Sequence, residues 1–289
     1  MNGPIASVVV PAYNEGAVID RCLRALTAES LPGPVEIVVA ANGCTDDTVA
    51  RARAFAGVTV LDLPDPGKVG ALNAADGVAT VFPRIYLDAD VELSPGTLGE
   101  LVGALTFPGA RCAAPELAFD LTDCTWPVRA FHRVFARLPS ARETLVGRGV
   151  YGLSRSGRER FGVFPQMQGD DLFVGRLFAA GEHVCVPGRS VVRPPRDLRS
   201  LLQVRTRVAR GNGQLAQASG EDLSVVAGAP ADFSSSTGRT GRALADLARA
   251  EPRLWPAIGV YVGVTVVARW RARRTRHATG TWNRDQSTR

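Results

Sequence analysis

The alternation of strand-like and helix-like patterns in the N-terminal third of the chain most constrains the fold. Apolar runs typical of buried strands lie at residues 5–11, 35–39, 58–63 and 85–87, with helical patterns between them. Parallel strands need crossover connections, so such a series predicts an α/β fold with a mostly parallel sheet flanked by helices. Ligands in open sheets of this kind collect at the carboxyl ends of the strands.

The fourth of these runs ends in two aspartates, Asp88 and Asp90. Alternate side chains of an extended chain point the same way, so both carboxylates can face one point beyond the strand. Oxygen ligands suit Mg²⁺ or Mn²⁺, which often bind through one or two carboxylates, substrate phosphate and water. The spacing favours a metal site, and the alternative is a turn that caps the helix starting near Ser94.

Polar residues also follow the other three strands. Tyr13 and Glu15 follow the first strand, Asn42 follows the second, and Lys68 begins a helix after the third. Lys68 is the only lysine beside 33 arginines. It is either a phosphate or base contact or a solvated lysine in the first turn of a helix. No G-x-G-x-x-G follows the first strand, which argues against a dinucleotide oxidoreductase.

A second acidic pair, Asp170 and Asp171, stands at the start of a helical pattern. Acidic residues are favoured at helix N-termini by the helix dipole alone, which is one interpretation of the pair. The functional interpretation is a general base, with one carboxylate facing a cleft and the other held by backbone donors. Upstream, residues 147–153 predict a Gly-rich strand that a ligand or another backbone approaches closely.

The remaining elements are less sharply patterned. We expect strands at residues 110–119, 183–186 and 190–192, and helices at 126–137 and 198–216. The last helix is basic, and its arginines either clasp a diphosphate or form a solvated face.

Composition excludes several classes of protein. The net charge of +6 arises from residues 253–289, which hold eight arginines and one aspartate, so the composition of the body indicates no basic face for nucleic acid. Five cysteines occur without a C-x-x-C pair, which is typical of reduced intracellular thiols. The first apolar run is short and contains Pro11, so we expect no signal peptide and a cytoplasmic protein.

Residues 254–268 are uncharged, and five arginines follow between 269 and 276. As a helix the uncharged stretch measures about 22 Å, short of the roughly 30 Å hydrocarbon core of a bilayer. We expect an interfacial segment, with Trp255 and Trp270 at its ends, that holds the protein peripherally on the inner face of the cell membrane. The alternative is a helix packed on the protein body or against another subunit.

Five stretches together, in order and spacing, resemble the family 2 glycosyltransferases, which are inverting sugar transferases with the nucleotide-diphospho-sugar (type A) fold. The likeness extends over roughly residues 5–215. Its most specific parts are residues 8–15, 42–46, 67–73, 87–90 and 169–172.

The resemblance implies a role for each matching position. Pro11, Ala12, Tyr13 and Glu15 would line the base and ribose pocket, Asn42 would face the base, and Lys68 would lie near the base or phosphates. Asp88 would touch ribose or sugar, and Asp90, with Asp88, would hold Mg²⁺ or Mn²⁺ on the diphosphate. Asp171 would be the catalytic base, as the second acid of its pair with Asp170.

Two positions depart from the family pattern. Asn42 stands where the family often has Asp, so the nucleotide base stays open. Gln203 is followed by Val-Arg-Thr-Arg207 rather than by the Gln-x-x-Arg-Trp motif of processive synthases, so polymerisation is not supported.

We therefore expect a metal-dependent hexosyltransferase. It would move a sugar from a nucleotide-diphosphate donor to a hydroxyl on a sugar, lipid-linked or small-molecule acceptor, in cell-surface glycan or glycolipid synthesis. The expected domains are a catalytic domain (1–216), a flexible linker (217–243) and an apolar helix with a basic tail (244–289). Two alternatives stay open: a nucleotidyltransferase of similar fold, and a catalytically silent scaffold at a membrane surface.

Overall fold

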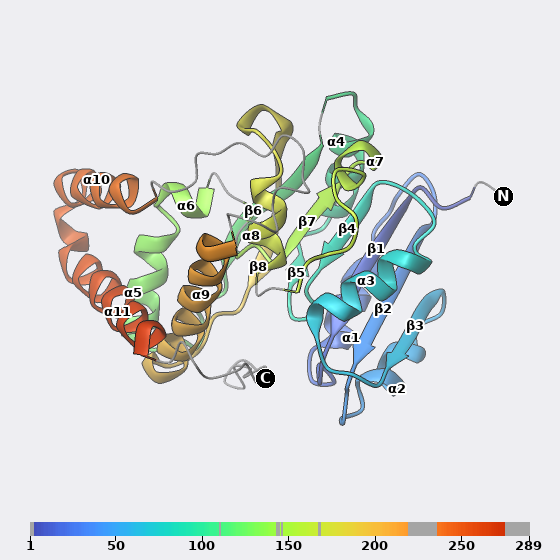
Figure 1. Ribbon diagram of the computed structural model, residues 1–289, viewed down its shortest axis with the longest axis horizontal. Coiled ribbons are helices and arrows are strands. Elements are labelled where there is room, and N and C mark those ends of the chain that lie inside the picture. Colours follow the sequence, from blue (N-terminus) through green and yellow to red (C-terminus); the bar gives the residue numbers. More distant parts are fainter. Residues whose placement is uncertain are drawn as a thin grey trace.

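The computed structural model describes residues 3–109, 111–142, 145, 147–166, 169–218 and 236–274 (Figure 1). The first half of the chain contains β1 (Ala6–Ala12), α1 (Ile19–Thr27), β2 (Val35–Asn42), α2 (Thr48–Arg53), β3 (Val58–Leu63), α3 (Lys68–Val78), β4 (Arg84–Leu87), β5 (Glu92–Leu93) and α4 (Thr97–Thr106). The second half contains β6 (Cys112–Phe119), α5 (Trp126–Phe135), α6 (Pro139–Arg142), β7 (Val150–Leu153), α7 (Arg155–Arg158), α8 (Asp170–Arg176), β8 (His183–Val192), α9 (Leu198–Ala218), α10 (Ser236–Ala250) and α11 (Trp255–Arg274).

One mixed sheet runs through the molecule in the order β3-β2-β1-β4-β7-β6-β8-β5. The first four of these strands are parallel, and β6 and β8 are parallel to each other. β7 is antiparallel to both β4 and β6, so β4 and β6 run in the same direction. The carboxyl ends of β1, β4, β6 and β8 therefore lie at one edge of the sheet, which confirms the α/β prediction.

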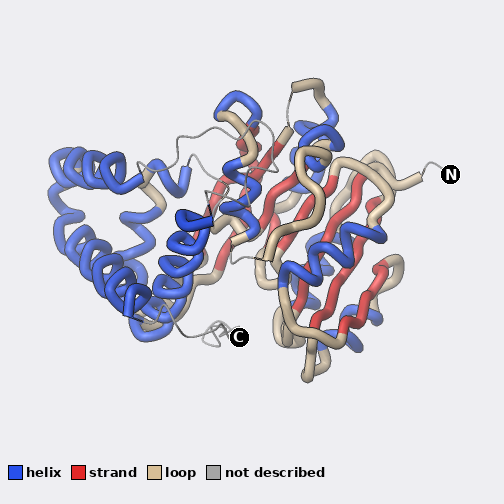
Figure 2. Tube along the Cα trace, viewed as in Figure 1, coloured by secondary structure: helices blue, strands red, loops and turns tan. Residues whose placement is uncertain are grey.

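Helices cover both faces of this sheet (Figure 2). On one face, α1 and α4 bury Leu23 and Leu98 against the strands in a continuous apolar core. On the other face, α3 and α8 bury Leu72 and Phe173 in a second core. Strand residues alternate between these cores because successive side chains point to opposite faces: Val8 enters the first and Val9 the second.

A third apolar cluster lies outside the sheet. It joins α5, α9 and α11 through residues such as Phe131, Leu201, Tyr261 and Val264. These helices gather, with α10, at the end of the molecule far from β3 (Figure 1). The chain therefore consists of a two-faced sheet body and an attached helical layer, as expected for a C-terminal helical extension.

Several boundaries differ from the sequence expectations. The two short strands expected at 183–186 and 190–192 form one strand, β8, because both parts pair with β6 across a bulge next to Pro115. The expected linker 217–243 is helical at its described ends, since α9 reaches Ala218 and α10 begins at Ser236. Residues 219–235 of that linker and 275–289 of the tail lie outside the described residues.

Candidate active site

Lys68, at the first position of α3, links two carboxylates from different elements of the fold. Its Nζ lies 2.7 Å from Oδ1 of Asp88, just after β4, and 2.8 Å from Oδ1 of Asp170, at the start of α8. Burial alone would lower the pKa of Lys68, but the charges of Asp170 and Asp88 outweigh it and raise the pKa above its usual value. Lys68 is therefore a fixed ammonium group within the site rather than a solvated lysine in the first turn of a helix.

Asp170 is held on its other side by an aromatic pair. The Tyr151 hydroxyl donates a hydrogen bond to Asp170 Oδ2 at 3.0 Å, and the Tyr151 ring stacks on Tyr86 with centroids 5.1 Å apart. Both tyrosines are almost fully buried. Asp170 therefore holds the Lys68 ammonium group in place, and its expected part in catalysis stays a prediction.

Asp171 is held by the backbone instead. The N–H of Gly147 donates to its Oδ2 and the N–H of Leu172 donates to its Oδ1, each at 2.8 Å. Burial raises the pKa of Asp171, the neighbouring charge of Asp170 adds to the rise, and Lys68 opposes it. The arrangement differs from the expected one, because the backbone donors hold Asp171, the expected base, while side chains hold Asp170, and both members line the same cavity.

That cavity lies at the carboxyl edge of β1 and β4. Most of the residues described above line this cavity, together with further residues of β1, α3 and β7. They are Pro11, Lys68, Leu72, Tyr86, Leu87, Asp88, Gly149, Val150, Tyr151, Asp170 and Asp171. Four predicted site residues other than Pro11 thus meet in one hollow: Lys68, Asp88, Asp170 and Asp171.

Asn42 lies at the same sheet edge but uses its amide within the protein. Its Nδ2 donates to the carbonyls of Ala12 and Ala40, at 2.8 and 3.3 Å, and its Oδ1 accepts from the N–H of Gly67 at 2.9 Å. The side chain therefore fixes the backbone that enters α3 immediately before Lys68. Its predicted contact with a nucleotide base is not supported by these bonds.

The other predicted nucleotide residues border this edge without lining the cavity. Ala12 is fully buried, and its carbonyl accepts the hydrogen bond from Asn42. Glu15 is buried, and its N–H donates to Thr48 Oγ1 at 2.7 Å, while Tyr13 is half-buried. Their contacts with base and ribose stay predictions.

The two aspartates predicted to hold a metal differ in setting. Desolvation raises the pKa of Asp88 to about 6, with Lys68 opposing and Asp170 and Asp90 adding to the rise. Asp90 is exposed. Within the described ranges, no three or more His, Cys, Asp or Glu side chains are grouped to hold an ion. Two carboxylates fit Mg²⁺ or Mn²⁺ that takes its other ligands from phosphate and water.

Gly149 allows the backbone of β7 to approach Asp88. It has φ +65°, and a Cβ at this position would lie 2.4 Å from Val91 Cγ2. Its carbonyl accepts from the N–H of Asp88 at 2.7 Å. The Gly-rich pattern of residues 147–153 correctly predicted a close approach, but neither the tyrosine pair nor the Gly147 N–H was identified from the sequence.

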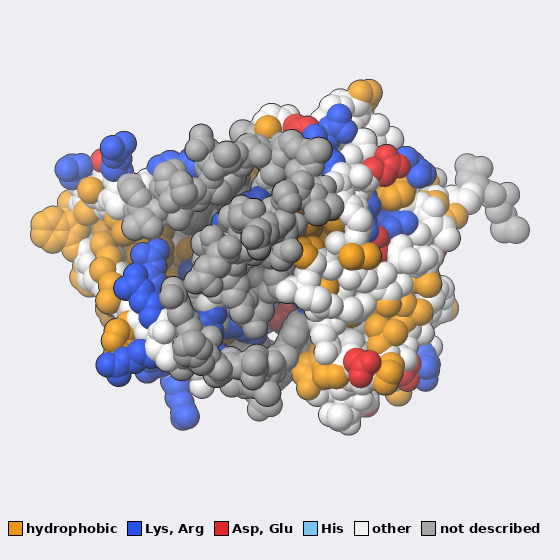
Figure 3. Space-filling view, in the orientation of Figure 1, with side chains coloured by type: hydrophobic (Ala, Val, Ile, Leu, Met, Phe, Trp, Pro, Cys, Tyr) orange, Lys and Arg blue, Asp and Glu red, His pale blue; other side chains and the backbone are white. Residues whose placement is uncertain are grey.

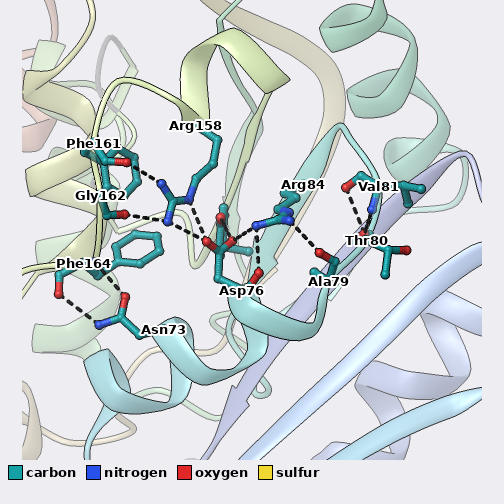
Figure 4. Close-up of polar contacts among 12 residues, drawn as sticks. Asn73, Asp76, Ala79, Thr80, Val81, Arg84, Arg158, Phe161, Gly162 and Phe164 are labelled. Atoms are coloured by element: carbon teal, nitrogen blue, oxygen red, sulfur yellow. Dashed lines mark hydrogen bonds and ion pairs between the residues drawn. The ribbon is translucent and has the colours of Figure 1, made fainter.

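Behind the cavity, α3 is bonded to the segment that precedes α8 (Figure 4). Asp76 accepts from Tyr86 Oη at 2.6 Å and pairs with Arg84 and Arg158, each also at 2.6 Å. Asn73 exchanges two hydrogen bonds with the backbone of Phe164. Burial raises the pKa of Asp76, but the Tyr86 and Arg158 hydrogen bonds outweigh it and hold the pKa below its usual value.

The chain is similar in sequence to known glycosyltransferases. A family model described as Glycosyl transferase family 2 matches residues 7–152. Glycosyltransferase AglE of Haloferax volcanii is 41% identical over 131 residues, which are 38% of this chain and 43% of the relative. An uncharacterized protein of Mycobacterium tuberculosis is 29% identical over 144 residues, which are 48% of this chain and 44% of the relative. The matched part is less than half the length of each curated relative.

Solved structures share the fold over most of the chain. The mannosyltransferase PcManGT from Pyrobaculum calidifontis, in complex with GDP-Man and Mn²⁺, aligns with a TM-score of 0.67 at 20% identity, over 96% of this chain and 88% of that chain. Glucosyl-3-phosphoglycerate synthase from Mycobacterium tuberculosis, in complex with UDP, aligns with a TM-score of 0.55 at 24% identity, over 80% and 82%. The sheet and its flanking helices are thus those of nucleotide-sugar transferases.

Proposed function

The chain belongs to glycosyl transferase family 2, and from this premise we propose that it transfers a sugar, with inversion, from a nucleotide-diphosphate donor to a hydroxyl acceptor. The observation that carries the proposal is the grouping of Asp88, Lys68 and Asp171 around one cavity at the carboxyl edge of the sheet. This grouping offers a cation site, a fixed positive charge and a base within one hollow.

Asp171 is the proposed catalytic base. Two backbone N–H groups fix its orientation, and its raised pKa makes the ionised carboxylate a stronger proton acceptor than an ordinary aspartate. The acceptor oxygen bonds to the anomeric carbon as its proton passes to Asp171. The bond from that carbon to the diphosphate oxygen breaks, and the nucleoside diphosphate leaves with the electron pair. Attack from the face opposite the leaving group inverts the configuration.

Asp88 and Asp90 are the proposed ligands of Mg²⁺ or Mn²⁺. When bound, the ion would supply positive charge that stabilises the leaving diphosphate. Lys68 keeps Asp88 in place and adds a second positive charge beside the proposed ion. One of the similar structures is a complex with GDP-Man and Mn²⁺ and another is a complex with UDP. These complexes support a metal and a nucleotide sugar and leave the base of the donor open.

Residues at and just after the ends of β1 and β2 are proposed to complete the nucleotide pocket. Pro11, Ala12, Tyr13 and Glu15 are proposed to surround base and ribose, and Asn42 to hold the backbone that forms the floor of this pocket. We assign catalysis to residues 1–216, a connecting role to 217–243, and a separate role to the helix and basic tail of 244–289. A sugar, lipid-linked or small-molecule hydroxyl of a cell-surface glycan or glycolipid is the proposed acceptor, modified at the inner face of the cell membrane.

The test compares the wild-type chain with Asp171→Asn, using nucleoside diphosphate sugars and Mn²⁺. We expect the variant to bind donor normally and to release nucleoside diphosphate about 100- to 10,000-fold more slowly, since general base catalysis contributes that much. The matched control is Asp62→Asn, an exposed aspartate on β3. NMR of the product should show the anomeric configuration opposite to that of the donor.

Three results would contradict the proposal. Release of pyrophosphate would indicate a nucleotidyltransferase. Retention of configuration would remove the single-base mechanism. Donor binding without turnover by the wild-type chain, across a panel of sugar and lipid-linked acceptors, would indicate a scaffold that keeps the fold.

A further inference from the structure

Helix α11 has two different apolar faces. One face carries Ala257, Tyr261, Val264, Ala268 and Ala272, all buried. Tyr261 and Val264 join the cluster formed with α5 and α9, where the Tyr261 ring stacks on Phe131 with centroids 5.0 Å apart. The helix is thus fixed lengthwise on the protein body.

The opposite face is exposed although it is also apolar. Trp255, Val262, Val266 and Trp270 follow one another at helical spacing, and their exposed fractions are 64%, 43%, 60% and 51%. Gly259 and Gly263 lie on the same side, and nothing approaches the position of a Cβ at either glycine. Scattered exposed apolar residues are normal, but a continuous row with a tryptophan at each end marks an interaction surface. Figure 3 shows hydrophobic side chains along the edge where α11 lies, bordered by basic ones.

Charge at the C-terminal end of α11 indicates what this surface contacts. Arg269, Arg273 and Arg274 are exposed there, and α11 contains no acidic residue. The Arg274 guanidinium lies 4.1 Å from the centroid of the Trp270 ring, so a positive charge and an aromatic ring lie next to each other on this surface. Tryptophan prefers the membrane–water interface, and arginine is attracted to anionic head groups.

We infer that Trp255, Val262, Val266 and Trp270, together with Arg269, Arg273 and Arg274, form a docking surface for the head-group region of an anionic lipid bilayer. The helix lies parallel to the membrane with its inner face on α5 and α9. None of the helices in the part of the chain that the structure describes has the length and hydropathy to cross a bilayer, which fits surface docking. The inference needs no assumption about donor, acceptor or catalysis.

A second copy of the chain is the competing occupant, because small residues such as Gly259 and Gly263 let two helices approach closely. Charge argues against it. Since α11 has no acidic residue, a second α11 would bring arginines and no counter-charges, whereas phosphatidylglycerol head groups supply negative charge along the whole surface.

The experiment is co-sedimentation of the full chain with vesicles of phosphatidylcholine alone or with phosphatidylglycerol, in the absence of donor and metal. We expect binding only with phosphatidylglycerol and weaker binding in high salt. Trp255→Ser combined with Trp270→Ser should reduce the partition coefficient by about tenfold or more, because interfacial binding scales with buried apolar area. The matched control is Phe107→Ser, a 73% exposed residue after α4.

A second variant tests the charges. Arg273→Gln with Arg274→Gln should reduce partitioning several-fold and weaken its salt dependence, since each basic residue near the surface contributes to attraction. Substitution is a cleaner test than removal of residues 253–289, because removal would uncover Phe131 and Leu201 of the third apolar cluster.

Four outcomes would overturn the inference: no binding to anionic vesicles, equal binding of the tryptophan variant, equal loss in the Phe107 control, or a wild-type dimer in analytical ultracentrifugation that the tryptophan variant converts to monomer. Nucleoside diphosphate release is measured for each variant in detergent-free buffer without vesicles. Loss of vesicle binding with unchanged release separates this surface from the proposed transferase chemistry.

Discussion

At the scale of single residues, Lys68 decides the electrostatics of the cavity. Asp88 follows β4 and Asp170 begins α8, and without a cation between them the two carboxylates would repel each other in a partly buried place. The ammonium group therefore has a structural task before any donor binds. A chain that otherwise uses arginine keeps its one lysine where a compact, point-like charge must contact two acids.

Replacing this charge should cost stability. In Lys68→Met, Asp88 and Asp170 lose their common partner, and we expect the free energy of unfolding to fall by about 3 kcal/mol, as when one member of a largely buried ion pair is removed. Urea unfolding at neutral pH measures it. Arg24→Met, which breaks an exposed pair with Asp20, is the control and should change stability by less than about 1 kcal/mol. Equal effects of the two substitutions would mean that Lys68 is an ordinary surface lysine.

The raised pKa of Asp171 predicts the pH dependence of catalysis. Transfer requires the ionised carboxylate, so the rate constant should fall as acidification protonates Asp171. Because its folded pKa lies above the ordinary aspartate value of 3.8, the acid limb should lie above that value and not at it. Rates of nucleoside diphosphate release at saturating donor and metal, from pH 4 to 8, give this limb. An acid limb at or below the ordinary value would contradict the assigned base.

At the scale of elements, α3 connects the two halves of the site. Its first residue is Lys68, and its later residues Asn73 and Asp76 hold the segment from Arg158 to Phe164 (Figure 4). That segment leads toward Asp170 and α8. Asp76 also accepts a hydrogen bond from Tyr86, which lines the cavity, so these contacts join α3, β4 and the segment that precedes α8 next to the candidate site.

This connection can be tested at Asp76. In Asp76→Asn the guanidinium groups of Arg84 and Arg158 lose a carboxylate whose side chain is only 7% exposed, and we expect a loss of about 3–5 kcal/mol in unfolding free energy. Thermal unfolding with and without urea gives the value. The control, Asp62→Asn, breaks the exposed pair with Arg53 and should cost less than about 1 kcal/mol. Similar losses of unfolding free energy in both variants would show that the contacts of Asp76 stabilise the protein no more than an exposed ion pair does.

Local patterns predicted the parallel half of the sheet well, because a continuous apolar run ending in polar residues specifies both a buried strand and its carboxyl end. β3 has the expected bounds, 58–63, and α8 begins at Asp170 as expected. The antiparallel insertion of β7 between β4 and β6 depends on pairing between distant segments, which periodicity does not report.

The same distinction applies to the site. Asp88, Lys68 and Asp171 were predicted because of their residue types and their positions at strand ends or helix starts, and the structure places all three at one cavity. Tyr151 was not, because an aromatic residue in a strand looks like core until its hydroxyl is seen 3.0 Å from Asp170. Asn42 was assigned to the base, whereas its three hydrogen bonds are with the backbone, and only the fold reveals those partners.

At the scale of the whole molecule, the helical layer and the sheet body have separate apolar clusters. His132 on α5 lies inside the helical layer, 6% exposed, with its Nδ1 2.9 Å from the carbonyl oxygen of Val128. Burial lowers the pKa of His132 to about 4, and the nearby charge of Arg205 adds to the effect. Protonation of the His132 imidazole is therefore unfavourable while the side chain is buried in this layer.

The layer should consequently be the part of the protein that acid weakens first. Between pH 6.5 and about 4 the unfolded chain binds a proton at His132 that the folded chain does not, so stability is complete above pH 6.5 and falls as pH decreases through this range. The shift corresponds to roughly 3 kcal/mol. Asp88 and Asp171 act in the opposite direction in this range, because their raised folded pKa values let the folded chain bind protons first. The measurement is therefore a comparison: urea unfolding at pH 7.0 and 4.5 should show the wild type losing more stability than His132→Gln, with His183, whose pKa is also lowered, retaining a part in both. Carboxylates held by partners, such as Glu182, lose their contribution to stability only at lower pH, because their folded pKa lies below the usual value.

A stability–pH profile of His132→Gln as steep as that of the wild type would place the acid sensitivity outside the helical layer.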